Sequence, residues 1–156
     1  MCDGHNITTQ ETYHYFFRLP LFEEKLREWL KTKTDWKDNV ISTAVNKWLQ
    51  EGLNDRSISR DIQWGIPIPG DPDKKMYVWF EAPIGYISFL MEYARSIGQE
   101  DIWKDFWDRN ANSEIVHFIG KDNIVFHTII WPAILMADER FKLPTSVPGN
   151  EFVNLE

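Results

Sequence analysis

The chain has 156 residues, enough for one domain with a hydrophobic core or a compact half-domain with a smaller appendage, and too few for two full domains. Its 43% apolar, 15% aromatic and 26% charged residues exclude a disordered chain. The net charge of −7 repels phosphate backbones, so we expect no strong nucleic-acid binding by this segment alone.

The cysteine content and the longest apolar run indicate in which compartment of the cell the chain is expected. A lone thiol, Cys2, can form neither an internal disulfide nor a zinc site by itself. It is interpreted as a free cysteine in a reducing cytosol, or alternatively as the remnant of a metal knuckle. The longest apolar run, 127–137, is shorter than a membrane span needs and is interrupted by Pro132. Because a signal pattern is also absent, we predict a cytoplasmic chain without a membrane segment.

The first predicted elements are a strand and a helix. Residues 1–11 are polar and patternless. Residues 13–19 are rich in aromatic side chains, which predicts a strand that ends at Pro20. Residues 21–31 predict a helix, because their apolar side chains recur every three or four residues and so share one face.

A second helix is predicted next, with Asp38 or Asn39 as its cap and Gly52 as its end. Both helices are interpreted as packing elements. Residues 54–61 are polar and predict irregular structure. Residues 64–72 contain three prolines and predict a loop or an edge strand.

Strand-type and helix-type segments alternate in the second half of the chain. They are a strand at 76–80, a helix at 82–97, a short helix at 102–107, a strand at 114–120, a helix at 122–136 and a strand at 152–155. This alternation predicts the α/β class, with a parallel sheet and right-handed crossovers. Since ligands bind at the carboxyl ends of parallel strands, the site is expected at 79–86 and 120–127.

Aromatic and acidic side chains in these two segments are candidate ligand contacts. Trp79 and Tyr86 border a turn of small residues and are either the floor of a pocket or part of the core. Gly120 would let a ligand approach the backbone. Asp122 could accept hydrogen bonds from a ribose, or could instead cap the following helix.

Two further candidates stand on the second long helix and before the proline-rich segment. His127 and Trp131 are four residues apart and point to one side of their helix, either into the core or toward a ligand. Arg60 is either half of a weak surface pair with Asp61 or a clamp for a carboxylate or phosphate.

Four segments in this order resemble methionyl-tRNA synthetases, a family of class I aminoacyl-tRNA synthetases. They are SRD at 59–61, YVWFEAPIGYIS at 77–88, FIGKDNIVFHTIIWPA at 118–133 and PGNEFVN at 148–154. The resemblance covers nearly the whole chain from Glu11 onward. Related synthetases for leucine, isoleucine, valine or cysteine share the fold, but the Ala82 to Tyr86 helix start and the His127 and Trp131 pair favour methionine.

The resemblance implies the second half of a Rossmann-type catalytic domain in residues 57–156, with flanking helices. Residues 1–56 would be the end of the inserted connective-peptide domain and a helical linker. It also implies a methionine–tRNA ligase that activates methionine with ATP and Mg²⁺ and transfers it to tRNA(Met).

The resemblance implies a role for ten residues. Arg60 would support activation. The methionine pocket would include Trp79, Ala82, Pro83, Tyr86, His127 and Trp131. Gly120, Asp122 and the backbone near Val153 would contact ATP. Asn123 and Ile130 depart from some members of the family and are not assigned.

Other parts of the family pattern are missing from these residues. They are the His-Ile-Gly-His motif, the Lys-Met-Ser-Lys-Ser-like loop, the zinc-binding cysteines and the anticodon-binding helices. We therefore expect the segment to be inactive alone, with zinc a possibility for the intact protein and not for this segment. An exposed sheet edge predicts self-association. The alternative is a non-catalytic binding or structural module with a nucleotide-binding fold.

Overall fold

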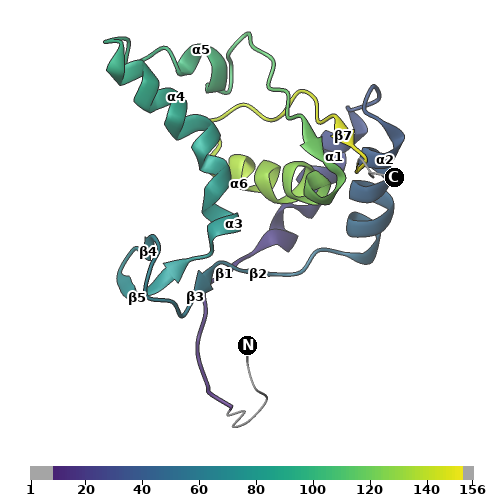
Figure 1. Cartoon of the computed structure of the whole chain (residues 1–156). Helices are drawn as coiled ribbons and strands as arrows, with labels where there is room; N and C mark the ends of the chain where they lie inside the picture. The colour runs from purple at the N-terminus through teal and green to yellow at the C-terminus, as the bar shows by residue number, and fades with distance from the viewer. Residues whose placement is uncertain (1–8, 153–156) are drawn as a thin grey trace, which may run out of the picture.

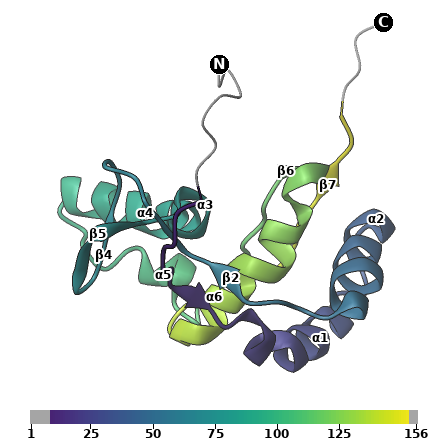
Figure 2. The ribbon, with the colours of Figure 1, turned by 90° about the horizontal axis from the view of Figure 1, so that it is seen from below.

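A helical segment runs through the middle of the molecule and separates two groups of elements (Figures 1 and 2). The structure is a computed structural model that describes residues 9–152. The central segment consists of η4 (Lys121–Asn123), the π-helical η5 (Phe126–Ile130) and α6 (Trp131–Asp138). It confirms the helix predicted at 122–136, including the Pro132 within it. Cys2 and Val153 lie outside the described residues.

The N-terminal helices pack on one side of this segment. They are η1 (Leu19–Phe22), α1 (Glu23–Lys31), α2 (Asp38–Ile41) and the π-helical η2 (Ser42–Leu49). Leu26 and Ala44 are fully buried in one core with Ile129 of the central segment. Both predicted helices are confirmed, and the second ends before Gly52, whose φ of 84° favours glycine.

Two details of the N-terminal predictions are wrong. Helix α2 is preceded by Lys37 without a side-chain cap, so Asp38 lies inside the helix. The strand predicted at 13–19 is reduced to β1 (Phe16–Phe17), which pairs antiparallel with β2 (Arg56–Ser57). The preceding residues instead direct their side chains into polar contacts with another strand, since the Tyr13 hydroxyl donates to Asp71 at 2.8 Å.

A small antiparallel sheet contradicts one further prediction and agrees with another. Its order is β3-β5-β4, with β3 (Ser59–Arg60), β4 (Pro67–Ile68) and β5 (Asp71–Met76). Strands β2 and β3 thus contradict an irregular 54–61. The edge position of β4 agrees with the prediction for 64–72, because Pro67 has no N–H to donate.

The strand predicted at 76–80 is also wrong. Strand β5 ends at Met76, and α3 (Val78–Glu81) follows at once. The backbone N–H of Tyr77 donates to the Ile58 carbonyl at 2.8 Å, which is the last contact of the sheet. The N–H of Phe80 then donates to the Tyr77 carbonyl and begins the helical turn. Trp79 therefore stands on a helical turn after an antiparallel strand.

The remaining helices form the other group of elements. They are η3 (Ala82–Ile84), α4 (Gly85–Ser96) and α5 (Lys104–Trp107). The helices predicted at 82–97 and 102–107 are confirmed, with bounds that differ by one or two residues. Ile87, Trp107 and Phe141 join Trp131 and Leu135 of α6 in a second core.

The central segment belongs to the crossover between two parallel strands. Strand β6 (Ile119–Gly120) pairs parallel with β7 (Gly149–Asn150), and Val116 bridges to Ser146 in the same sense. The strand predicted at 114–120 is thus much shorter than expected. The partner strand lies earlier than 152–155: Phe152 is outside any strand, and residues 153–155 are outside the described part. The α/β class is confirmed. No helix among residues 9–152 is long and apolar enough to cross a bilayer.

Candidate functional site

A cleft of about 710 Å³ lies between β1 and β2, the turn from β5 into α3, and the first half of the central helical segment. Its walls contain Arg60, Trp79 and Asp122. These residues come from the three different sets predicted for activation, methionine and ATP. The structure therefore brings together candidates that are up to 62 residues apart in the chain.

Arg60 lies along the wall formed by β3 and is not paired with Asp61. Its Nη1 donates to the Ser59 carbonyl at 2.7 Å and to the Ser57 hydroxyl at 3.0 Å. Its guanidinium carbon is 3.9 Å from the centre of the Tyr77 ring. The interpretation as a surface pair with Asp61 is wrong. Since only Nη1 is engaged among the described residues, Nε and Nη2 keep donors for a ligand.

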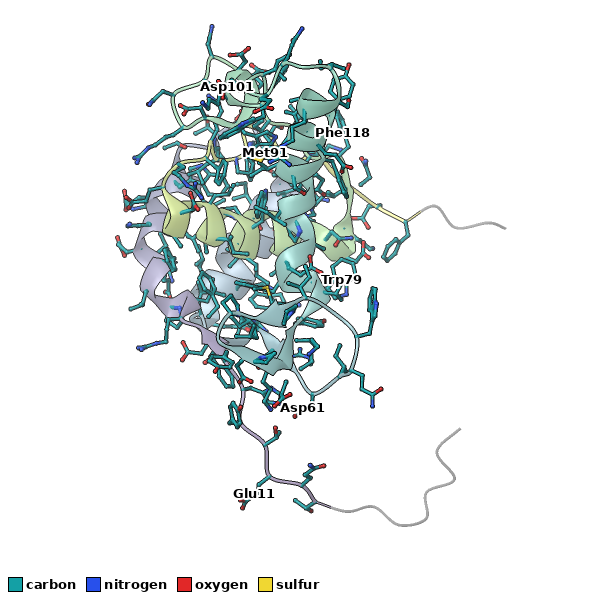
Figure 3. The ribbon with its side chains drawn as sticks, turned by 90° about the vertical axis from the view of Figure 1, so that its left-hand side faces the viewer. Glu11, Asp61, Trp79, Met91, Asp101 and Phe118 are labelled. Atoms are coloured by element: carbon teal, nitrogen blue, oxygen red, sulfur yellow. The ribbon has the colours of Figure 1, made fainter. Side chains whose placement is uncertain are left out.

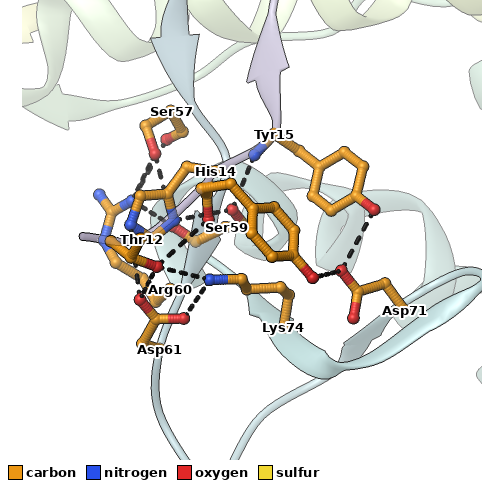
Figure 4. A network of polar contacts seen from close by, with 10 residues as sticks. Thr12, His14, Tyr15, Ser57, Ser59, Arg60, Asp61, Asp71 and Lys74 are labelled. Atoms are coloured by element: carbon orange, nitrogen blue, oxygen red, sulfur yellow. Dashed lines mark hydrogen bonds and ion pairs between the residues drawn. The ribbon is translucent and has the colours of Figure 1, made fainter.

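A polar network behind Arg60 holds its strand in place (Figure 4). The buried Lys74 forms an ion pair with Asp61 and donates to the Thr12 hydroxyl at 2.8 Å. The Thr12 hydroxyl in turn donates to Asp61 at 2.6 Å. These contacts hold the pKa of Asp61 below its usual value, with the Lys74 hydrogen bond as the largest cause. Ser59 is fully buried and accepts from the backbone N–H of Tyr15 at 2.9 Å.

Trp79 lies at the junction of the small sheet and α3, on the surface of the molecule (Figure 3). About half of its side chain is exposed, and its ring meets Phe126 edge-on with centroids 5.9 Å apart. Pro83 is buried and Ala82 is exposed one turn later. Trp79 is thus an open aromatic wall of the cleft rather than a core residue.

Tyr86 and His127 are joined by a hydrogen bond of 2.9 Å between the tyrosine oxygen and Nε2. The other ring nitrogen, Nδ1, lies 3.0 Å from the Asn123 carbonyl, which can only accept. Nδ1 therefore carries the proton, and Tyr86 must donate to Nε2. Burial lowers the pKa of His127, which keeps the ring neutral, and raises the pKa of Tyr86.

Aromatic rings surround this pair. The ring of His117 is centred 4.8 Å from Tyr86 and 5.0 Å from His127, and Trp131 is 6.3 Å from Tyr86. Burial, followed by the neighbouring His127, lowers the pKa of His117 to about 4. His117 Nε2 and Trp131 Nε1 are buried without a partner among residues 9–152. Buried polar atoms are nearly always satisfied, so these two mark a place where a ligand or water belongs.

Gly120 and Asp122 lie at the end of β6, where the central helical segment begins. A β-carbon on Gly120 would be 2.7 Å from a carboxylate oxygen of Asp122, so the exposed Asp122 side chain would have to shift to accommodate it. Asp122 is exposed and makes no capping hydrogen bond, which contradicts its interpretation as a helix cap. Its carboxylate remains available at the carboxyl end of a parallel strand.

Several residues of the cleft were missed by the sequence interpretation. They are Trp48, Arg56, Tyr77, Asn123, Phe126 and Ile130. Asn123 and Ile130 depart from some members of the family, so the resemblance does not assign them. No local pattern indicates Arg56, because its neighbourhood is predicted to be irregular and its strand pairs with the distant β1.

Two other hollows are less convincing sites. One of about 770 Å³ lies near α1 and the end of α6 and contains none of the predicted residues. A smaller one of about 330 Å³ borders Tyr86 and His117 and continues the aromatic cluster. Among residues 9–152, no group of three carboxylate, imidazole or thiol side chains could hold a metal ion.

The parallel crossover defines an α/β protein, and the cleft reaches the carboxyl end of one of its parallel strands, where such folds bind ligands. The chain belongs to the class I tRNA synthetase family described as tRNA synthetases class I (M), whose model matches residues 1–156.

Similar proteins carry the name of one enzyme. The methionine–tRNA ligase of Pyrococcus furiosus is 48% identical over 164 aligned residues, covering 96% of this chain and 22% of the relative. That of Dehalococcoides mccartyi strain ATCC BAA-2266 is 50% identical, covering 94% and 26%. Mycobacterium tuberculosis methionyl-tRNA synthetase in complex with methionyl-adenylate is 30% identical with a TM-score of 0.76, covering 97% and 28%. The chain therefore spans about a quarter of the length of these proteins.

Proposed function

We propose that these residues form one part of the active site of a methionine–tRNA ligase. The observation that supports this most strongly is the cleft shared by Arg60, Trp79 and Asp122 in a chain similar to enzymes of that name. The reaction would join the methionine carboxylate to the α-phosphate of ATP, with release of pyrophosphate. The 3′-terminal ribose of tRNA(Met) would then attack the activated carbonyl and release AMP.

Methionine would be bound by the aromatic residues. Its thioether is polarizable and only weakly polar, so a selective site needs ring faces and few strong donors. Trp79 offers an exposed face, and Ala82 and Pro83 give the small surface beside it. The Tyr86 proton is already donated to His127, which leaves the indole N–H of Trp131 and Nε2 of His117 as the polar groups of this cluster without a partner among residues 9–152.

ATP would be bound at the turn after β6. Asp122 would accept hydrogen bonds from the ribose, and the absence of a side chain on Gly120 would let the adenosine approach the backbone. The backbone near Val153 is proposed for the same contact by family resemblance. ATP would enter as its Mg²⁺ complex; no step here depends on a protein-bound metal, and zinc is proposed only for a longer polypeptide.

Arg60 would stabilise negative charge that develops during activation. The stack on Tyr77 and the hydrogen bonds of Nη1 fix its orientation, and Nε and Nη2 remain free to donate. Preorganised donors of this kind stabilise a charged transition state without reorganising. Residues 57–156 would supply this half of a Rossmann-type domain, residues 1–56 the end of the connective insertion, and the enzyme would act in the cytoplasm.

The test is amino-acid-dependent exchange of labelled pyrophosphate into ATP by the full-length protein that carries these residues. We expect exchange with methionine and little with leucine, isoleucine, valine or cysteine, because the cluster offers aromatic contacts rather than a plain aliphatic pocket. Exchange driven by one of those amino acids would reassign the substrate. No exchange with any of them would support a non-catalytic module and contradict the proposal.

A further inference from the structure

Arg56 is a cation in the cleft that the proposed reaction has not yet used. It stands on β2, where it pairs with Phe17 of β1, and its guanidinium carbon lies 4.6 Å from the centre of the Trp48 ring. Its Nε is buried and has no hydrogen-bond partner among residues 9–152. The neighbouring Asp55 does not neutralise it, because that carboxylate pairs with Arg18 at 3.6 Å.

Arg56 and Arg60 resemble each other in their surroundings. Both line the cleft, and both lie over an aromatic ring, Trp48 and Tyr77 respectively. Neither has a carboxylate within 4.0 Å among the described residues. They are four residues apart on β2 and β3, so their α-carbons are at most about 13 Å apart. In a chain with a net charge of −7, this is a local concentration of positive charge.

Unpaired guanidinium groups over aromatic rings suit one class of ligand. A phosphate oxygen would satisfy the open N–H donors of Arg56. The free face of the guanidinium, or an exposed ring such as Phe16, would stack against a base. Cations combined with stacking surfaces are how proteins bind single-stranded nucleic acid without reading its sequence.

We propose that Arg56, supported by Trp48, binds the single-stranded 3′ end of the tRNA as it enters the cleft. This inference rests on the proposed function, because it names the residues that receive the second substrate. The proposed ATP contacts, Gly120 and Asp122, lie at the β6 end of the central segment, whereas Arg56 belongs to the β2 wall. We therefore assign the β6 end of the cleft to ATP and the β2 wall to the tRNA, and the experiment below separates the two.

The experiment compares two reactions of the full-length protein. Pyrophosphate exchange needs methionine and ATP but no tRNA, and aminoacylation of tRNA(Met) needs all three. Arg56→Gln should raise the KM for tRNA about tenfold and lower the slope of log KM against log salt concentration by about 1, since one phosphate contact is lost. Pyrophosphate exchange should stay within about twofold of the unaltered protein, because ATP and methionine do not touch Arg56.

Two variants complete the design. Arg56→Lys keeps the charge and loses the planar group. It should therefore keep the salt dependence of the unaltered protein, with a KM for tRNA between those of the unaltered protein and Arg56→Gln. This variant carries the test if Arg56→Gln does not fold. Arg140→Gln is the matched control, because Arg140 also lies over an aromatic ring, Phe141, but away from the cleft. It should leave both reactions unchanged.

Several results would overturn the inference. Equal losses in both reactions would show that Arg56 binds ATP or only supports the fold, and unchanged kinetics for Arg56→Gln would show that it binds nothing. Failure of the unaltered protein to catalyse methionine-dependent exchange would instead overturn the proposed function. The two failures are therefore distinguishable.

Discussion

At the scale of single residues, the state of the histidines is set by burial and by one backbone carbonyl. The Asn123 carbonyl fixes the proton of His127 on Nδ1, and Tyr86 is consequently a donor to that ring. Protonation of His127 would add a proton to Nε2 and remove the acceptor for the tyrosine hydroxyl. His117, 5.0 Å away, would add a second positive charge within the same cluster. The aromatic cluster is therefore organised for neutral imidazoles.

This leads to a prediction about pH. The pKa of His117 is lowered from 6.5 to about 4 and that of His127 is lowered as well, so the unfolded state binds more protons than the folded state in this range. Stability should be fully present above pH 6.5 and should be lost as pH falls toward 4. The shift of His117 alone corresponds to a loss on the order of 3 kcal/mol.

The measurement is urea unfolding at several pH values, followed by tryptophan fluorescence, together with NMR titration of the imidazoles. His117→Gln should flatten the dependence between pH 6.5 and 4. His14→Gln is the control, since His14 lies at the surface network and not in the cluster. An NMR pKa near 6.5 for His117 would contradict this account.

Some site residues could be predicted from the sequence and others could not. Trp79, Asp122 and Arg60 were identified through the family resemblance, and the structure places them in one cleft. The interpretation of Asp122 as a cap was wrong, because a short 3-10 turn precedes the helix and leaves the carboxylate outside it. Arg56 cannot be predicted locally, because its position depends on pairing with Phe17, 39 residues away in the chain.

At the scale of elements, the helices were predictable and the strands were not. Helical stripes recur every three or four residues and are visible within 10 residues of sequence. Most strands here have two residues, too few for an alternating pattern, and their pairing depends on distant segments. The helical turn at Val78–Glu81 has the composition of a strand, and tertiary contacts decide its conformation.

A second prediction concerns the packing of the N-terminal helices on the central segment. Leu26 is fully buried in a core that includes Ile124 and Ile129. Leu26→Ala should reduce stability by about 2–5 kcal/mol, and the loss should spread to the central helix. Leu21→Ala is the matched control, because 67% of Leu21 is exposed, and it should cost less than about 0.5 kcal/mol.

Hydrogen–deuterium exchange of the full-length protein measures this directly. Leu26→Ala should speed exchange at the amides of residues 124–136 as well as in α1. Faster exchange confined to residues 19–31 would show that the two parts do not share one core. The division at residues 56 and 57 would then separate independent units.

At the scale of the whole molecule, we propose that the chain contributes one part of a larger active site. It spans about a quarter of the length of the relatives, and its cleft has open aromatic walls such as Trp79. Self-association through a sheet edge stays a prediction; among the described strands, every strand except β5 has an unpaired edge. The central claim at this scale is the division of the site between methionine, at the aromatic residues Trp79 and Tyr86, and ATP, at Asp122.

Steady-state pyrophosphate-exchange kinetics of Tyr86→Phe and Asp122→Ala in the full-length protein test that claim most directly. Tyr86→Phe removes the hydroxyl that orients His127, so it should raise the KM for methionine and weaken discrimination against leucine by about 1–3 kcal/mol, with little change for ATP. Asp122→Ala should raise the KM for ATP about tenfold and leave methionine nearly unchanged, because a hydrogen bond from the ribose to a carboxylate is lost. Equal losses for both substrates in both variants would mean that these residues only maintain the fold, and would contradict the assignment of the cleft.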